Sequence, residues 1–325
     1  MALALLLLAL RASTPDSREA LEARFRTLAA PAGGEVGVSV LHLETGHGAS
    51  FHGRERFPMA SVFKLPLAVA FLARVDRGEL RLDQSVVLGP ADMRSPGPLS
   101  ERAPTGGITV SLRELLEAML LDSDNTAADL LLPLSGGPEV VTARLDAAGL
   151  DDIRIDRSEA ELAFDSYGVS PHPPRQEWTL AGIRRAIQES PDAARRGALA
   201  RFLADPRDTA TPDALVQLLR QIDEGRGLSK ESRSRLLDLM AETRVGEKRI
   251  RGGLPPGTPV AHRTGTGADV AGVSIVTNDI GIVTLPNGRG RLAIVVMIKD
   301  STKSLAEREA AIAAIARAAF DYWTR

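Results

Sequence analysis

Hydrophobic and polar residues alternate near both ends of the chain, a pattern typical of strands with one buried face. Residues 35–43 alternate in this way, residues 46–48 turn the chain, and residues 49–52 return as a second strand. Four further strands are expected at residues 259–264, 270–277, 281–285 and 292–299. Turn residues at Asn278-Asp279 and Pro286-Asn287-Gly288 separate the last three, so we expect an antiparallel meander.

Apolar residues recur at helical spacing in several other segments. The expected helices lie at residues 17–29, 61–78, 112–121, 126–134 and 305–323. Ser111, followed three residues later by Glu114, is typical of a capping box at the start of a helix. The final helix is amphipathic and rich in alanine, so we expect it to pack on the sheet. Residues 88–107, rich in proline and glycine, indicate a loop region.

Strands from both ends of the chain enclose a helical middle, and this order predicts an α/β fold with an all-α lobe. In this interpretation, residues 17–60 and 212–325 build the α/β lobe, an antiparallel sheet flanked by N- and C-terminal helices. Residues 61–211 form the all-helical lobe. No internal repeat or low-complexity tract appears.

The composition is that of an ordinary globular protein and excludes several function classes. Of 325 residues, 44% are hydrophobic and 25% are charged, and the net charge of −2 offers no basic surface for nucleic acid. The absence of cysteine excludes disulfides, iron–sulfur clusters and thiolate metal sites. The basic residues are almost all arginine, so Lys64 within an apolar run stands out.

Three histidines, His42, His47 and His52, recur every five residues. Because the first and last lie in strand-like segments on either side of a turn, their spacing does not fit a compact zinc site. We therefore expect surface or cross-strand packing roles for them, and neither a metal nor a cofactor.

The first ten residues are almost purely leucine and alanine, and Arg11-Ala12-Ser13 follows. This stretch is too short to span a bilayer and resembles the apolar core of a secretory signal. The expected basic leader is missing, so either the true start lies upstream or the segment is a buried helix end. We expect residues 1–16 to be a signal-like segment of an exported bacterial protein, periplasmic or secreted, without a stable membrane anchor.

Ser61-Val62-Phe63-Lys64 is the chain's only S-x-x-K and the strongest candidate for chemistry. In a helix, the spacing of three brings Lys64 beside Ser61. A desolvated lysine with a lowered pKa can then take the proton of a serine nucleophile. The alternative is an N-cap serine and a solvated lysine, but the apolar surroundings favour a buried lysine that needs a carboxylate, an amide oxygen or the serine itself as a partner.

Three further motifs follow this one in order. They are Ser123-Asp124-Asn125, then Arg157-Ser158-Glu159, then Arg263-Thr264-Gly265-Thr266-Gly267 ahead of the C-terminal strands. Each is weak alone, but together the set resembles the class A serine β-lactamases, in which S-x-x-K, S-D-N, a glutamate-bearing omega loop and [KR]-T-G line one cleft between the two lobes. The resemblance covers about residues 17–323.

The resemblance implies a catalytic role for each matching residue. Ser61 would attack the strained amide carbonyl, with Lys64 or Glu159, the latter through a water, as the base. Ser123 would relay a proton to the departing ring nitrogen. Asn125 would bind the side-chain amide of the substrate and hold Lys64 in place.

The resemblance also implies how the substrate is held. The backbone N–H groups of Ser61 and Thr266 would form an oxyanion hole. Arg263, Thr264, Gly265 and Thr266 fall where the family recognises the substrate carboxylate, and arginine suits a planar anion as well as the commoner lysine.

Many relatives add a second arginine on the strand after this motif, but Gly272 and Val273 occupy that region here. Arg249 lies where some relatives carry an arginine that reaches the same carboxylate, and we expect it to substitute. The alternative is a solvated surface charge.

Glu159 distinguishes this chain from the penicillin-binding peptidases, which lack an equivalent glutamate and stay acylated by β-lactams. Two residues depart from the family pattern, because Ala160 replaces the usual proline and Ala163 the usual asparagine that fixes the hydrolytic water. Alanine has no hydrogen-bonding side chain, so either Asp165 or a main-chain group holds this water, or deacylation is slower.

The omega loop is enlarged. The family closes this loop with an ion pair, so the resemblance implies that Arg157 and Asp208 form it, which makes a loop of 52 residues, roughly three times the family's usual span. Residues 166–206 read as an insertion in which residues 178–190 and 193–204 form a helical hairpin. The hairpin either walls the cleft or rests outside it, and we expect a surface elaboration.

The predicted function is hydrolysis of the cyclic amide of a small-molecule β-lactam through an acyl-serine intermediate, with glutamate-assisted deacylation, by a monomer. A D-alanyl-D-alanine peptidase or esterase using the same serine is the first alternative. A non-hydrolytic penicillin-binding sensor is the second.

Overall fold

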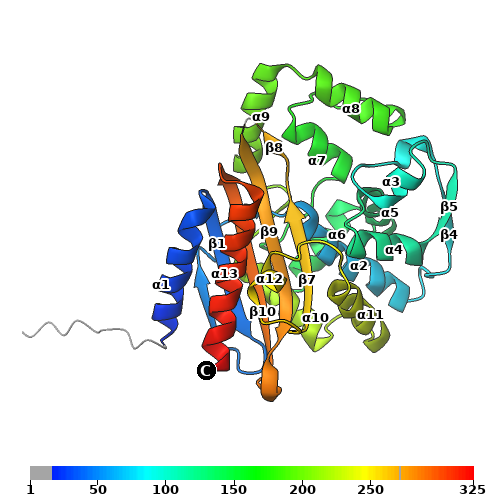
Figure 1. Ribbon diagram of the computed structural model, residues 1–325. Helices are drawn as coiled ribbons and strands as arrows, with labels where there is room; N and C mark the ends of the chain where they lie inside the picture. The colour runs from blue at the N-terminus through cyan, green and yellow to red at the C-terminus, as the bar shows by residue number, and fades with distance from the viewer. Residues whose placement is uncertain (1–16, 271) are drawn as a thin grey trace, which may run out of the picture.

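The computed structural model describes residues 17–270 and 272–325, so the signal-like segment 1–16 lies outside the described residues. The chain folds into a sheet covered by helices and, beside it, a mostly helical lobe (Figure 1). The antiparallel sheet flanked by helices agrees with the α/β fold expected from the alternating ends of the chain.

The main sheet is antiparallel and combines strands from both ends of the chain. Its members are β1 (Glu35–His42), β2 (Gly48–Phe51), β7 (Val260–Thr266), β8 (Asp269–Val270), β9 (Val273–Thr284) and β10 (Arg291–Ser301). They lie in the order β2-β1-β10-β9-β7, with β8 paired to β9. The register is fixed by burial on both faces, because a slip of one residue would exchange the two faces of each strand.

The expected turn at Asn278-Asp279 is wrong, since β9 continues through it from Val273 to Thr284. Both side chains are fully buried and find partners inside the protein. Asn278 Nδ2 donates to the carbonyls of Pro58 and Met59, and Asp279 accepts from the backbone N–H of Ile250. Tertiary hydrogen bonds therefore replace the solvent contacts that usually place these residues in turns.

Alternation along β10 divides the core into two layers. Ile294, Val296 and Ile298 face α1 (Arg18–Ala29) and α13 (Leu305–Thr324), which cover one side of the sheet (Figure 1). The next residues along the strand face the opposite layer, where α10 (Pro212–Glu224) packs on β10 and β1. The final helix thus packs on the sheet as its amphipathic pattern predicts.

The helical lobe is built around α2 (Lys64–Asp76), whose side chains are almost all buried. The other helices of the chain outside the omega loop are α3 (Pro98–Arg102), α4 (Leu112–Leu121), α5 (Asn125–Leu134), α6 (Pro138–Ala147), α11 (Lys230–Ala241) and α12 (Ile250–Gly253). Ser111 caps α4 by accepting from the backbone N–H of Glu114, but the Glu114 side chain binds Arg102, so only half of the expected capping box forms.

Short strands and 3-10 helices complete the described residues. Two ribbons that the pattern did not predict pair β3 (Phe57–Pro58) with β6 (Thr209–Ala210), and β4 (Ser85–Leu88) with β5 (Ile108–Ser111). The 3-10 helices are η1 (Ala30–Ala32), η2 (Ala60–Phe63), η3 (Pro90–Asp92), η4 (Arg175–Glu177) and η5 (Pro286–Gly288). The β3–β6 ribbon matters for the site, because it ties the entry to η2 to the end of the omega loop.

The omega loop carries three helices, α7 (Glu159–Ser166), α8 (Leu180–Glu189) and α9 (Asp192–Ala204). The last two are the expected hairpin. Figure 1 shows α8 above α7 and α9 beside β8, at one end of the sheet. Ile183 of α8 packs against Ala160 and Phe164, so the hairpin is joined to α7 through an apolar contact.

The described parts of the chain lack a membrane-spanning helix and a cluster of metal-ligating side chains. No helix within residues 17–270 and 272–325 is long and apolar enough to cross a membrane. The same residues contain no group of three or more histidine, cysteine, aspartate or glutamate side chains placed to hold a metal ion. His42 is buried, and its ring nitrogens contact Arg289 O and Thr45.

Candidate active site

Ser61 lies on the 3-10 turn η2 that leads directly into α2. The backbone N–H of Lys64 donates to Ser61 O, and side chains three apart eclipse one another in a 3-10 helix, so Lys64 lies beside Ser61 as the motif predicts. Ala60, just before the serine, has a φ of 43°, which is strained for a residue with a β-carbon. Such strain is typical of functional sites and fixes the direction in which the serine is presented.

The Lys64 side chain is fully buried, and its ammonium is held by three groups. Nζ donates to Ser123 O at 2.8 Å and to Asn125 Oδ1 at 2.5 Å, and it lies 2.9 Å from Glu159 Oε1. Burial lowers the pKa of Lys64, although the carboxylate of Glu159 acts in the opposite direction. The lysine is therefore buried with a carboxylate partner, and the alternative of a solvated helix lysine is wrong.

Ser123-Asp124-Asn125 forms the bend between α4 and α5. Ser123 has a φ of 62°, a left-handed conformation that turns the chain sharply toward Lys64. Asp124 caps α5 by accepting from the N–H of Ala127 at 2.8 Å, and its other oxygen accepts from the N–H of Leu99 at 2.8 Å. Burial raises the pKa of Asp124 despite these bonds. Its role is to hold the bend, so that both neighbours reach Lys64.

Glu159 is the first residue of α7, and its side chain is 15% exposed. Ser158 and Glu161 form a capping box that starts this helix. Besides the Lys64 ammonium, no group among the described residues hydrogen-bonds Glu159 Oε1, which keeps that oxygen available as an acceptor. The glutamate thus faces the lysine from the omega loop.

Two residues position this glutamate, and neither was predicted from the sequence. Asp129 Oδ1 accepts from the backbone N–H of Glu159 at 2.6 Å, and Arg94 Nε binds Asp129 Oδ2 at 2.7 Å. Arg94 also donates to Trp178 O in the insertion. Burial raises the pKa of Asp129. One feature of the sequence could have identified Asp129: it is an aspartate within the apolar run of α5, and a buried charge requires a partner.

The strand β7 brings the fourth motif against the nucleophile. A β-carbon on Gly265 would lie 2.4 Å from Met59 O, so only glycine permits β7 to approach η2 this closely. Arg263 is fully buried, donating from Nε to Ser61 O at 3.0 Å and from Nη2 to Ser123 Oγ at 2.6 Å. Burial lowers its pKa to about 10. Arg263 therefore joins the nucleophile's turn to the proposed relay serine.

Arg249 is also buried, with 4% of its surface exposed, which excludes the solvated surface charge. Its Nη1 donates to Asn278 O at 2.8 Å, its Nε pairs with Glu309 at 3.2 Å, and its Nη2 donates to Thr266 Oγ1 at 2.7 Å. Thr264 is buried beside it, whereas Thr266 is exposed at the end of β7. Arg249 thus contributes positive charge directly behind the exposed threonine.

The base of the omega loop contains the expected ion pair. Arg157 Nε lies 2.6 Å from Asp208 Oδ2, and Asp208 Oδ1 accepts from the backbone N–H groups of Asp156 and Arg157. Asp165 joins this cluster by pairing with Arg157 at 2.5 Å and with His172 at 2.8 Å. Asp165 is thus occupied at the loop base, which argues against it as the residue that replaces the missing asparagine at position 163.

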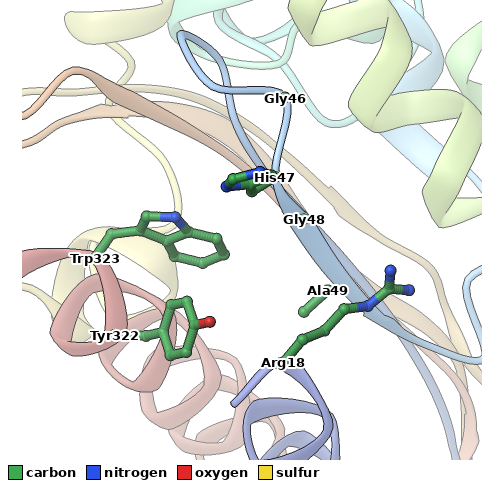
Figure 2. A pocket seen from close by; sticks show the side chains of 7 residues that line it. All are labelled: Arg18, Gly46, His47, Gly48, Ala49, Tyr322 and Trp323. Atoms are coloured by element: carbon green, nitrogen blue, oxygen red, sulfur yellow. The ribbon is translucent and has the colours of Figure 1, made fainter. Parts of the chain in front are cut away.

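A surface hollow of about 290 Å³ lies far from these motifs in the fold. Figure 2 shows its lining, in which His47 of the β1–β2 turn faces Tyr322 and Trp323 at the end of α13. None of the residues that line it belongs to the four motifs. The catalytic groups therefore converge elsewhere, where η2, the α4–α5 bend, α7 and β7 meet.

The side chains on those four elements are typical of one class of enzyme. A serine presented by a strained turn, a buried lysine beside it and a glutamate facing that lysine belong to serine hydrolases that work through an acyl-enzyme.

Comparisons with known proteins identify the family. A profile described as the β-lactamase enzyme family matches residues 20–323. The extended-spectrum β-lactamase PER-1 of Pseudomonas aeruginosa is 33% identical over 270 residues, covering 82% of this chain and 76% of that protein. β-Lactamase VEB-1, also of Pseudomonas aeruginosa, is 30% identical over 292 residues, covering 89% and 85%.

Solved structures agree with this result. A β-lactamase from Chitinophaga pinensis has a TM-score of 0.78 and 34% identity, covering 93% of this chain and 98% of that one. TLA-1 extended-spectrum β-lactamase has a TM-score of 0.78 and 30% identity, covering 95% and 99%. The chain belongs to the β-lactamase family and is a class A serine β-lactamase, a hydrolase of the β-lactam amide that acts through an acyl-serine.

Proposed function

We propose that Ser61 is the nucleophile and that Lys64 and Glu159 control its protonation. The observation that carries this proposal is the position of Lys64 Nζ, which lies within 2.9 Å of Glu159 Oε1, Asn125 Oδ1 and Ser123 O. One buried ammonium therefore connects the three motifs that the acylation step requires. A proton leaving Ser61 can pass through a water to the Glu159 carboxylate, or to Lys64 after its ammonium has given a proton to Glu159 Oε1, 2.9 Å away.

Ser123 is the proposed proton relay to the ring nitrogen. Arg263 Nη2 donates to Ser123 Oγ, so the hydroxyl hydrogen is directed away from the arginine and is free to be given to the departing nitrogen. The positive charge of Arg263 also stabilises the alkoxide character that develops on Ser123 during this transfer.

Substrate recognition is assigned to β7 and its neighbours. The backbone N–H groups of Ser61 and Thr266 form the oxyanion hole in this proposal. Thr264, Gly265 and Thr266 present the site for the substrate carboxylate, and Arg263 and Arg249 supply the positive charge. Asn125 receives the side-chain amide of the substrate through Nδ2, because one Nδ2 hydrogen donates to Ser95 O at 3.2 Å and the second is the proposed donor to the substrate.

Glu159 performs deacylation by activating a water against the Ser61 ester. Ala163 offers this water no side-chain partner, so the main chain of α7 is the proposed second contact. This role separates the chain from a D-alanyl-D-alanine peptidase or esterase and from a sensor, because both would keep the β-lactam ester on the serine.

We also propose that the enzyme is exported, to the periplasm or the medium, and that it acts as a monomer. The apolar segment at residues 1–10 supports export. Size-exclusion chromatography of the protein from a periplasmic extract, with sequencing of its mature N-terminus, checks both statements together.

The experiment that tests the catalytic assignment is intact-mass measurement after mixing with a penicillin. Wild type should release ring-opened product, and Ser61→Ala should give neither product nor adduct while remaining folded. A D-alanyl-D-alanine peptide should be left uncleaved. Turnover of the penicillin by Ser61→Ala would contradict the proposal, and efficient cleavage of the peptide would favour the peptidase instead.

A further inference from the structure

The inserted helix α9 packs against the edge of the active site. Leu199, Phe202 and Leu203 contact an apolar cluster whose buried members are Val270 on β8 and Ile275 and Val276 near the start of β9. Figure 1 shows α9 and β8 together at this end of the sheet. We call the three residues of α9 and these three strand residues the bridging cluster. The expectation of a plain surface elaboration does not describe this half-buried contact.

The same helix is fixed to the omega loop. The Phe202 ring lies 5.2 Å from the guanidinium of Arg157, a cation–π contact at the loop base. Ser190, between the two inserted helices, donates to Tyr167 O at 2.8 Å, just after α7. A β-carbon on Gly168 would lie 2.7 Å from Ala194 O, which shows how closely α9 approaches the end of α7. The insertion is therefore packed onto the loop that carries Glu159.

On the other side, the bridging cluster is continuous with the catalytic turn and strand. Ala60, the strained residue before Ser61, packs against the cluster. The N–H of Gly267 donates to Val276 O and the N–H of Ile275 donates to Ala268 O, each at 3.0 Å. These bonds connect the start of β9 to the segment that follows Thr266 at the end of β7. The α9 contacts thus reach both sides of the site.

We propose that α9, through Phe202 and Leu203, fixes the separation between the omega loop and the strands β8 and β9, and so limits the size of the acyl side chain that the enzyme accepts. This inference rests on the proposed function, in which Asn125 holds the side-chain amide and the acyl side chain extends between the omega loop and these strands. Packed interiors resist expansion, so a wall braced by an apolar helix does not open for a bulky group.

The test compares a cephalosporin carrying a bulky acyl side chain with a penicillin carrying a small one. Phe202→Ala removes the largest side chain of the α9 contact, and we expect the ratio of kcat/KM for the bulky over the small substrate to rise at least about fivefold. Arg201→Ala is the matched control, because Arg201 is the exposed neighbour on the same helix and should leave the ratio unchanged. A ratio within twofold of wild type in folded Phe202→Ala would overturn the inference.

Two further measurements test the inference even if Phe202→Ala does not fold. Phe202→Leu keeps an apolar contact and should give a smaller rise of the same sign. Hydrogen exchange at residues 272–276 should be faster in the Phe202 variants than in Arg201→Ala. Unchanged exchange and an unchanged ratio in Phe202→Leu would contradict the inference alone, whereas absence of a Ser61 adduct in wild type would contradict the proposed function.

Discussion

The candidate active site and the base of the omega loop both contain buried charges, but burial decides the pKa values in the site, whereas ion pairing decides the pKa of Asp165 at the loop base. In the site, burial lowers the pKa of Lys64 and raises the pKa values of Asp124 and Asp129. At the loop base, burial also raises the pKa of Asp165, but hydrogen bonds from Arg157 and His172 outweigh it, so the net pKa is lowered. Burial therefore dominates in the site, and ion pairing dominates at Asp165.

A burial-dominated shift is typical of residues kept for chemistry, and the structural ion-pair residue Asp208 shares it. A pKa shifted against the charged form means that the folded state pays for that charge, which active sites accept in return for reactivity. The backbone shows the same pattern, since Ala60 and Ser123, both beside catalytic groups, adopt positive φ values. Asp208 lies between the two cases, because burial raises its pKa although Arg157 acts against that shift.

The largest expected effect is on catalysis. The double variant Lys64→Met/Glu159→Gln, which replaces the Lys64–Glu159 ion pair, should lower kcat/KM by about 10⁴-fold or more, because both candidate bases are lost. Stability should stay the same or rise by roughly 1 kcal/mol, because exchanging a buried ion pair for neutral groups removes their desolvation cost. Kinetics and urea unfolding measure the two effects. A marked loss of stability would mean that Lys64 and Glu159 stabilise the fold.

The next effect is on the loop base. Asp208→Ala should lower the free energy of unfolding by about 3–5 kcal/mol, because it leaves the buried Arg157 without this partner. The control is Asp152→Ala, which breaks the exposed pair with Arg56 and should cost about 1 kcal/mol or less. Thermal and urea unfolding of both variants provide the measurement, and equal losses would remove the distinction between buried and exposed pairs.

The smallest effect depends on pH. Asp165→Asn should cost about 1 kcal/mol near neutral pH, because one of the partners of Arg157 is lost. The folded-state pKa of Asp165 is below its ordinary value of 3.8, so its contribution is complete above that value and is lost as pH falls through the folded pKa. Unfolding free energies of wild type and Asp165→Asn should differ by a constant amount from pH 7 to 5 and converge below about pH 4. A difference that grows in acid would reverse the sign of this coupling.

Sequence reasoning located the residues whose chemistry is local. The S-x-x-K pair and the two inserted helices follow from spacing and helical periodicity, the omega-loop pair Arg157–Asp208 follows from the family resemblance, and the structure contains all three. The apolar run around Lys64 predicts only that this lysine needs a partner. Its partners come from distant segments, so no local pattern identifies them, and only the resemblance implied Asn125.

The features that were missed depend on tertiary contacts. Asn278 and Asp279 resemble a turn, yet both are buried in β9, because Asn278 donates to the Pro58 and Met59 carbonyls and Asp279 accepts from the N–H of Ile250. Asp129 supports Glu159 across 30 positions of sequence. The contact of Phe202 with the strands β8 and β9 brings together residues from the insertion and the sheet, which helical periodicity alone does not relate.

The central claim is that Glu159 releases Ser61 from the acyl-enzyme, even with alanines at positions 160 and 163. Rapid-quench intact-mass measurement with a chromogenic cephalosporin, comparing wild type with Glu159→Gln, tests it most directly. Glu161→Gln is the matched control, because it lies on the same helix and a glutamine at that position can preserve the capping box. We predict a stoichiometric adduct on Ser61 in Glu159→Gln, hydrolysed about 10³-fold more slowly than in wild type and in the control. Turnover of Glu159→Gln within tenfold of wild type, without a persistent adduct, would contradict the account.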